Sequence, residues 1–232
     1  MKLSLPCLLS VVLGTALPAQ ANLTVHPMRV SVDARRGAQI RVYSQSTQTQ
    51  YVQVDLRHIV DPAGSDEREM AVEPEDAAIA VTPRRFALAA GGNRLIRIVP
   101  LQPVGEETAY RIYFEGVQGE DDARPMASTP GVDAKIGVRL VWGALVNVLP
   151  PEGTVDVQVR GGALHNAGSL RVGIIGIDAC DGSRCTGHPL AHSLYPGGTL
   201  GLPFPLQAGG TLQLHYRLSR DGYREHVQTL VP

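Results

Sequence analysis

Residues 134–151 read AKIGVRLVWGALVNVLPP, a stretch that predicts one long β-strand. Every even position from Ile136 to Val148 is apolar, whereas the odd positions at its start are basic or glycine. Alternation with period two is the pattern of a strand with two unlike faces, and the same residues would scatter around a helix. The run is roughly twice as long as an ordinary strand. Because a strand this long and apolar promotes aggregation when uncovered, it is either a central core strand or a strand kept for a partner.

Shorter segments with a strand pattern precede this stretch. The first carries Pro27 and is predicted to lie at an edge or to switch between sheets, because proline cannot donate a backbone hydrogen bond. About seven strands with frequent turn residues, and no amphipathic helix of useful length, predict an immunoglobulin-like sandwich. The predicted strands are residues 23–32, 39–44, 51–60, 79–88, 94–100, 108–117 and 134–149.

A second, smaller sandwich is predicted after the sequence Pro150-Pro151-Glu152-Gly153. The prolines end the long strand and stiffen the connection that follows it. Beyond them the chain is again strand-like, with short segments interrupted by glycine and proline. We therefore expect an all-β protein with one domain at residues 22–150 and another at 151–232. The predicted strands of the second domain are residues 155–159, 170–179, 199–204, 211–219 and 223–231.

The N-terminus has the features of a secretory signal peptide. Lys2 supplies the positive start, an apolar run follows, and Ala19-Gln20-Ala21 has the small-x-small form of a cleavage site. The apolar run is too short for a membrane span. We expect cleavage after Ala21, which leaves 211 of the 232 residues as an exported chain without stable membrane insertion.

The charge and the motifs of this mature chain argue against several functions. Without Lys2 it has 20 basic and 22 acidic residues, so its near-neutral charge gives no reason to expect nucleic acid. It contains no glycine-rich phosphate loop, nucleophile elbow or zinc-protease motif. Its histidines are scattered, and five of them are expected to have no matching base or metal partner: His26, His58, His165, His215 and His226. The sequence therefore predicts neither an enzyme nor a bound cofactor or metal.

Two cysteines remain in the mature chain, Cys180 and Cys185. An exported protein with two cysteines usually pairs them, so a disulfide is the favoured prediction. A zinc site is the alternative, because His188 and His192 complete the pattern C-x4-C-x2-H-x3-H. The two residues between the Cys pair and the His pair are far fewer than the dozen or so of common zinc fingers. Free thiols are the third alternative.

Several stretches of the first domain resemble, in order, the periplasmic, PapD-like pilus-assembly chaperones of the chaperone–usher pathway. The similarity covers most of residues 22–151, whereas the second domain matches in length and strand content alone. It implies two immunoglobulin-like domains in a boomerang arrangement. Within the family, the chain resembles a divergent branch similar to the alternate or ECP-type fimbrial chaperones. The resembling stretches are PMRVSVD (27–33), VTPRRFALAAGGNRLIRIV (81–99) and EETAYRIYFEGV (106–117), and Pro150 aligns with the proline that closes the family's first domain.

The resemblance also implies a function. The chain would act in the periplasm, stabilise pilin subunits by donor-strand complementation and deliver them to an outer-membrane usher, without a cofactor or ATP. Arg29 would anchor the C-terminal carboxylate of the pilin. Ile136, Val138 and Leu140 would fill the open groove of the pilin.

The family pairs its anchoring arginine with a lysine on the long strand, and this chain departs from that pattern. The aligned position holds Leu145, and Leu149 replaces an arginine usually found just before the closing proline. Arg139 lies on the same strand but roughly 20 Å from Leu145 along an extended chain, so we predict that it is not the substitute. The candidates for a second cation are Arg41, Arg111 and Arg171.

Two other classes of protein remain open at this stage. A secreted immunoglobulin-like pilin or adhesin subunit is the main alternative, although such proteins normally carry their own donor segment at the mature N-terminus. An enzyme or sugar-binding sandwich would need clustered aromatics or carboxylates, and aromatic residues make up only 5% of this chain.

Overall fold

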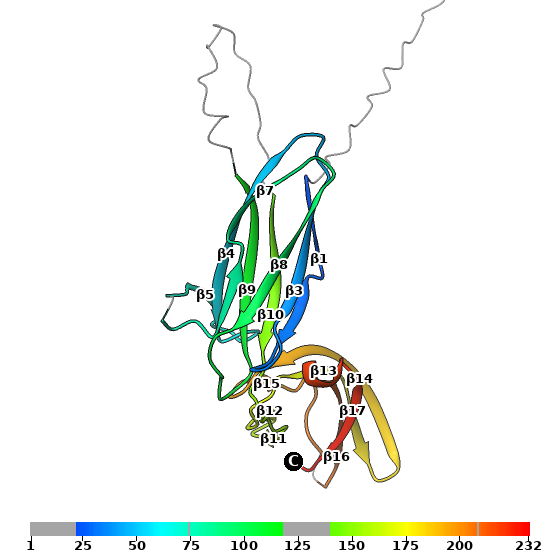
Figure 1. The fold of residues 1–232 in the computed structure, drawn as a ribbon. Helices are drawn as coiled ribbons and strands as arrows, with labels where there is room; N and C mark the ends of the chain where they lie inside the picture. The colour runs from blue at the N-terminus through cyan, green and yellow to red at the C-terminus, as the bar shows by residue number, and fades with distance from the viewer. Residues whose placement is uncertain (1–21, 74, 118–139, 208) are drawn as a thin grey trace, which may run out of the picture.

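The computed structural model describes residues 22–73, 75–117, 140–207 and 209–232. These form four β-sheets, arranged as two sandwiches that follow each other in the chain (Figure 1). The strands of the first sandwich are β1 (Leu23–His26), β2 (Arg29–Val32), β3 (Ala38–Ser44), β4 (Gln50–Val60), β5 (Arg68–Ala71), β6 (Ile79–Thr82), β7 (Arg85–Leu88), β8 (Asn93–Pro100), β9 (Thr108–Val117) and β10 (Val141–Val148).

One sheet of the first sandwich has the strand order β1-β3-β8-β6, and the other has the order β2-β10-β9-β4-β5, with β7 also paired to β4. The expected switch of the first strand is confirmed: β1 pairs with β3, and after Pro27 the chain crosses to the other sheet, where β2 pairs with β10. The core lies between the sheets, where side chains such as Ile40, Ile96 and Phe114 are fully buried.

The strand predicted at residues 79–88 is instead two strands in different sheets, because the chain changes sheet near Pro83: β6 pairs with β8, whereas β7 pairs with β4. The short strand β5 was not predicted from the sequence. All four of its residues are exposed, so it lacks the apolar alternation that identifies a half-buried strand.

The second sandwich contains a sheet of order β11-β12-β15 and another of order β14-β13-β16-β17. The predicted disulfide is present: Cys180 and Cys185 face each other across the β13–β14 hairpin, with Cα atoms 4.0 Å apart. Sequence analysis missed β12, which is short, and β14, whose exposed residues follow no clear alternation. The strands are β11 (Val157–Arg160), β12 (Ala163–Asn166), β13 (Val172–Asp181), β14 (Arg184–Leu194), β15 (Thr199–Gly201), β16 (Thr211–Arg217) and β17 (Glu225–Leu230).

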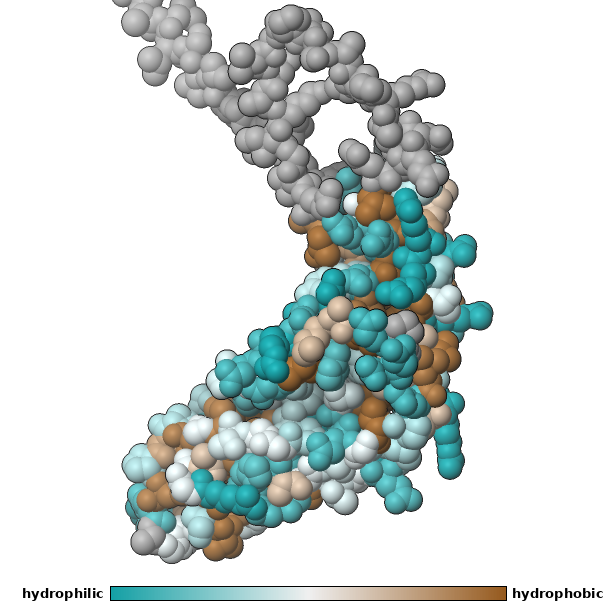
Figure 2. Space-filling model, turned by 90° about the vertical axis from the view of Figure 1, so that its left-hand side faces the viewer, coloured by the Kyte–Doolittle hydropathy of each residue, from teal (hydrophilic) through white to brown (hydrophobic). Residues whose placement is uncertain are grey.

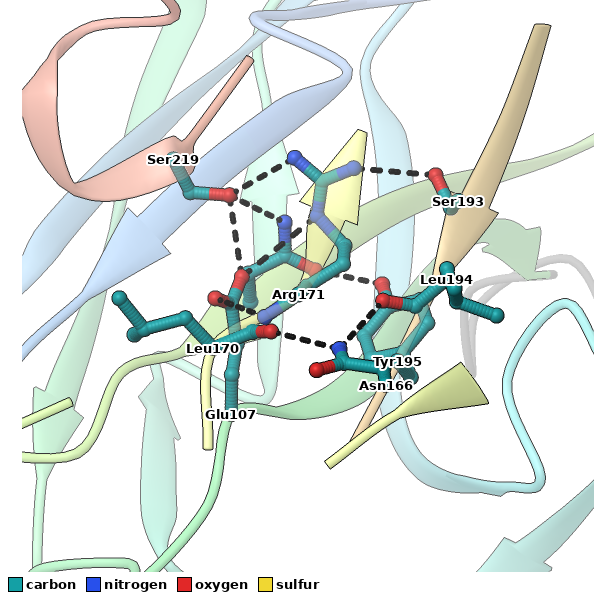
Figure 3. Close-up of polar contacts among 9 residues, drawn as sticks. Glu107, Asn166, Leu170, Arg171, Ser193, Leu194, Tyr195 and Ser219 are labelled. Atoms are coloured by element: carbon teal, nitrogen blue, oxygen red, sulfur yellow. Dashed lines mark hydrogen bonds and ion pairs between the residues drawn. The ribbon is translucent and has the colours of Figure 1, made fainter. Parts of the chain in front are cut away.

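The two sandwiches meet at an angle, so that the molecule is bent (Figure 2). A buried polar network joins them (Figure 3). Glu107, which precedes β9 of the first sandwich, accepts a hydrogen bond from the Arg171 backbone N–H at 2.9 Å and another from the Ser219 hydroxyl at 3.0 Å. The Arg171 guanidinium donates to the hydroxyls of Ser193 and Ser219, both at 3.0 Å. The network therefore fixes the second sandwich against one end of the first.

Candidate functional site: an open strand edge that ends at Arg29

Strand β10 has two halves that differ in what covers their edges. All eight of its residues pair with β9 on one side. On the other side, Leu145–Val148 pair with β2 in parallel, from Leu145 opposite Arg29 to Val148 opposite Val32. Within the described part of the chain, no strand pairs with the residues 141–144 on that side. As far as the described residues show, the first half of β10 is therefore a sheet edge without a neighbouring strand, which we call the open edge.

The backbone groups at this open edge can be identified from the pairing below it. The Leu145 N–H donates to the Met28 carbonyl at 2.9 Å, and the Leu149 N–H donates to the Val32 carbonyl at 2.8 Å. Odd-numbered residues therefore direct their backbone groups toward β2. Since this direction alternates along a strand, Val141 and Gly143 direct their N–H and C=O groups toward the open edge. The edge is ready to accept another strand.

The even-numbered face of β10 passes from core to surface. Ala144, Val146 and Val148 are buried in the core of the first sandwich. Leu140, which shares their parity, lies just before β10 and its surface is 49% exposed. Ile136 and Val138, predicted to continue this face, lie outside the described residues. In the described region, the apolar face is therefore buried in the protein's own core at the C-terminal end of β10 and exposed to solvent at its N-terminal end, beside the open edge.

Arg29 stands where the open edge ends. It is the first residue of β2, it lies opposite Leu145, and it is exposed. Val32 of the same strand is fully buried in the core, so the side chains of Arg29 and Ser31 point to the outer face of the sheet. Among the described residues, Arg29 makes no hydrogen bond or ion pair, which leaves its guanidinium free to bind an anion.

Two other arginines on this outer face are already paired with acids. Arg57 of β4 lies 2.6 Å from Asp55. Arg111 of β9 lies 3.1 Å from Glu69 and 3.7 Å from Glu67. Arg29 therefore differs from its neighbours in having no carboxylate partner among the described residues.

The three candidates for a second cation lie in different places. Arg111 is in register with Leu145, and hence in one row with Arg29 on the same outer face. Arg41 lies between the buried residues Ile40 and Val42 of β3, so it points outward from the opposite sheet of the sandwich, where it donates to Asn93 at 2.6 Å. Arg171 is only 3% exposed and belongs to the network between the domains. Arg139 lies outside the described residues.

The apolar residue Leu145 has a structural role in this protein. It packs with Tyr195 of the second sandwich, together with Ile59 and Ala109 of the first. Burial raises the pKa of Tyr195 to about 12, and its hydroxyl donates to the Asn147 side chain at 2.8 Å. The leucine is thus part of the joint between the sandwiches, a relation that no local sequence pattern reveals.

Two histidines do have acidic partners, contrary to the prediction from the sequence. His215 lies 3.1 Å from Asp178 on the neighbouring strand, and His226 contacts Asp221. Asp178 is 37 positions from His215 in the sequence, and a turn separates Asp221 from His226, so sequence spacing did not indicate either pair. No group of three or more metal-binding side chains occurs in the parts of the chain that the structure describes, and no helix there is long and apolar enough to cross a membrane.

Comparison with known proteins gives a consistent answer for the fold. No protein-family model matches the chain. The solved structure of the class 5 fimbriae chaperone CfaA superimposes with a TM-score of 0.74 at 22% identity, over 91% of this chain and all of that one. The CsuC–CsuE chaperone–adhesin complex of Acinetobacter baumannii gives a TM-score of 0.57 at 9% identity, over 90% of this chain and 98% of that one.

The fold is that of the fimbrial chaperones. The resemblance found in the sequence is thereby confirmed at the level of the two-domain immunoglobulin-like architecture. In sequence, the chain is 26% identical to a protein of Escherichia coli named as a fimbrial subunit of CS1, over 77% of this chain and 79% of that protein. It is also 26% identical to a protein of the same species named as a fimbrial subunit of CFA/I, over 77% and 78% of the two chains.

Proposed function

We propose that this protein is a periplasmic chaperone that binds fimbrial subunits by adding the open edge of β10 to them and delivers them to an outer-membrane usher. The observation that carries the proposal is the open edge itself, which ends at Arg29, an arginine without an acidic partner in the described ranges. A fimbrial subunit that lacks one strand of its own sandwich would expose a groove and an unpaired strand edge. Adding β10 to it satisfies both sets of backbone groups.

The position of Arg29 selects the direction of the guest strand. A guest that continues the line of β2 and runs parallel to β10 has its C-terminus at the end of the open edge, directly before the level at which Arg29 pairs with Leu145. A guest that runs antiparallel brings its N-terminus there, and two positive charges repel each other. The guanidinium can form a bidentate pair with a terminal carboxylate. Arg29 thus favours a parallel strand that ends at this point.

The apolar stripe supplies the remaining affinity. Leu140 is exposed at the edge, and Ile136 and Val138 share its parity, so the three would enter the groove of the guest on one face. Burial of each side chain is worth roughly 1.5–3 kcal/mol before the costs of association. A second cation is best supplied by Arg111, since Arg41 points from the opposite sheet and Arg171 is buried in the joint.

The alternative function, that of a structural component of the fimbria, has weaker support. The names of two relatives mention fimbrial subunits, at 26% identity. Solved structures that share the two-domain fold over nine-tenths of the chain are described as chaperones or chaperone complexes. The chaperone function also accounts for a signal peptide cleaved after Ala21 and for domains at 22–150 and 151–232, which we retain as proposals.

Capture of a fimbrial subunit in the periplasm tests this proposal. The chain is co-expressed with an untagged fimbrial subunit and purified by its own tag. We expect Arg29→Ala to lose the bound guest, because a hydrogen-bonded charged contact contributes about tenfold to a hundredfold in affinity. Arg41→Ala is the matched control, since it removes an exposed arginine from the opposite face and should capture normally. Equal capture by both variants would refute the assignment of Arg29.

A further inference from the structure

The side chains of Arg111 and Tyr113 lie across β10 toward its open edge. Gly143 of β10 is in register with Tyr113. A Cβ atom on Gly143 would stand 3.0 Å from Cε1 of Tyr113 and 3.1 Å from Cδ of Arg111. Because glycine has no side chain, both neighbours occupy this space. The aliphatic part of the Arg111 side chain therefore lies over β10. Only β10 separates β9, which carries Arg111, from the position of a guest strand.

Glu69 of β5 holds these two side chains in place. Its Oε1 lies 3.1 Å from the Arg111 guanidinium, and the Tyr113 hydroxyl donates to its two carboxylate oxygens at 2.9 and 2.8 Å. Glu67 is the more distant partner of Arg111 at 3.7 Å, and its other oxygen accepts the Ala63 N–H at 2.6 Å. Glu69 is thus the principal acid that occupies Arg111.

This ion pair is easily exchanged. The side chain of Arg111 is 32% exposed and that of Glu69 is 25% exposed. Ion pairs in contact with solvent contribute little stability, so another carboxylate at the same distance competes on nearly equal terms. A guest whose terminal carboxylate is bound at Arg29 would place such a competitor in the same row.

We propose that Glu69 competes with the guest carboxylate for Arg111 and thereby favours release of the guest. With the edge empty, Glu69 occupies Arg111. With a guest in place, Arg111 binds the terminal carboxylate of the guest instead, and Glu69 continues to compete for the Arg111 guanidinium. The inference rests on the proposed function, since it requires a carboxylate at Arg29, and it assigns to an acid on the β4–β5 hairpin the control of how long the guest stays bound.

A peptide probe tests the role of Glu69. The probe has nine residues, alternates valine with threonine and ends in a free carboxylate, and its dissociation is followed by fluorescence anisotropy. We expect Glu69→Gln to slow dissociation about twofold to fivefold, the scale of one solvated ion pair. Glutamine keeps an acceptor oxygen for the Tyr113 hydroxyl. In an Arg111→Ala background the same change should have no effect.

Asp55→Asn is the matched control. Asp55 pairs with Arg57 on the same face, but on β4, one strand farther from the open edge than Arg111. This variant should leave dissociation unchanged. Equal rates for Glu69→Gln and wild type, or a gain that persists without Arg111, would overturn the inference.

The same assay separates this inference from the proposed function. Arg29→Ala should remove the preference of the protein for the carboxylate peptide over its C-terminal amide. If that preference is lost while Glu69→Gln behaves as wild type, the role of Glu69 alone is wrong. If Arg29→Ala keeps the preference, the proposed function itself fails.

Discussion

The two halves of β10 continue one apolar alternation but have different surroundings. In the second half, β2 covers the edge and Val146 and Val148 are buried in the core. In the first half, no strand covers the edge among the described residues, and Val141 and the preceding Leu140 are about half exposed. The difference arises at Pro27, where the first strand leaves one sheet and begins to cover β10 only at Arg29. One strand thus serves as core at one end and as a binding edge at the other.

This comparison explains why the arginine lies where it does. A charge placed at the point where pairing ends marks the end of the available edge and limits how far a guest strand can extend. The covered half also carries Asn147, which contacts Tyr195 and Ser219 of the second sandwich. The end of β10 that cannot accept a guest is therefore the end that positions the two domains.

The largest expected effect separates the two halves directly. Val146→Asp places a carboxylate without a partner in the core and should destabilise the protein by more than about 4 kcal/mol, or prevent folding. Leu140→Asp has the same chemistry on an exposed residue of the same face, and its effect on stability should stay within about 0.5 kcal/mol. Urea unfolding of both variants checks this difference. Equal destabilisation would mean that the two halves do not differ in burial.

The joint beside the covered half gives the next largest effect. Arg171→Ala leaves Glu107 buried without its counter-charge, and should cost about 3–5 kcal/mol at neutral pH. Arg57→Ala, which breaks a partly exposed pair, should cost less than about 1 kcal/mol. Urea unfolding at pH 7.5 measures both, and similar losses for the two variants would contradict a structural role for the network.

The cost of Arg171→Ala should also depend on pH. Burial raises the pKa of Glu107, and the charge and hydrogen bonds of Arg171 oppose that rise. Without Arg171 the folded-state pKa rises further, so the folded protein binds a proton that the unfolded chain has released above about pH 4.3. Stability of the variant therefore falls as the pH increases through this window. We expect a smaller deficit at pH 4 than at pH 7.5, and a constant deficit would contradict this explanation.

A smaller effect is expected far from β10. The disulfide joins two cysteines that are only five positions apart and so closes a short loop. The double substitution Cys180→Ser and Cys185→Ser should therefore lower the free energy of unfolding by about 2 kcal/mol. The β13–β14 hairpin points away from β10 (Figure 1), and peptide binding should not change. Thermal unfolding and the anisotropy assay measure the two results, and a loss of peptide binding would show that the second sandwich contributes to the site.

The sequence predicted the features that depend on local patterns. Alternation identified most strands, Pro27 identified the switch of the first strand, and two cysteines in an exported chain identified the disulfide. Alternation could not show which half of β10 is covered, since Val146 in the covered half and Leu140 before the open half fit the same pattern. That difference depends on where β2 begins, which is a property of the topology.

Contacts between segments that are distant in the chain could not be predicted from the sequence either. The polar network joins Glu107 to Ser219, across 112 positions of the chain, and no spacing rule connects them. Arg29 was predicted from the family resemblance. Its lack of an acidic partner among the described residues is known only from the structure, in which Arg57 and Arg111 on the same face do have acidic partners.

The direction of a bound strand tests the central claim most directly. A nitroxide label is placed at the N-terminal end of the nine-residue carboxylate peptide, roughly 27 Å from its C-terminus in an extended strand. Loss of backbone amide signals is then measured by NMR. A parallel guest anchored at Arg29 should broaden the amide of Val141 and spare those of β2. Strong broadening of the β2 amides would show an antiparallel guest and contradict the account.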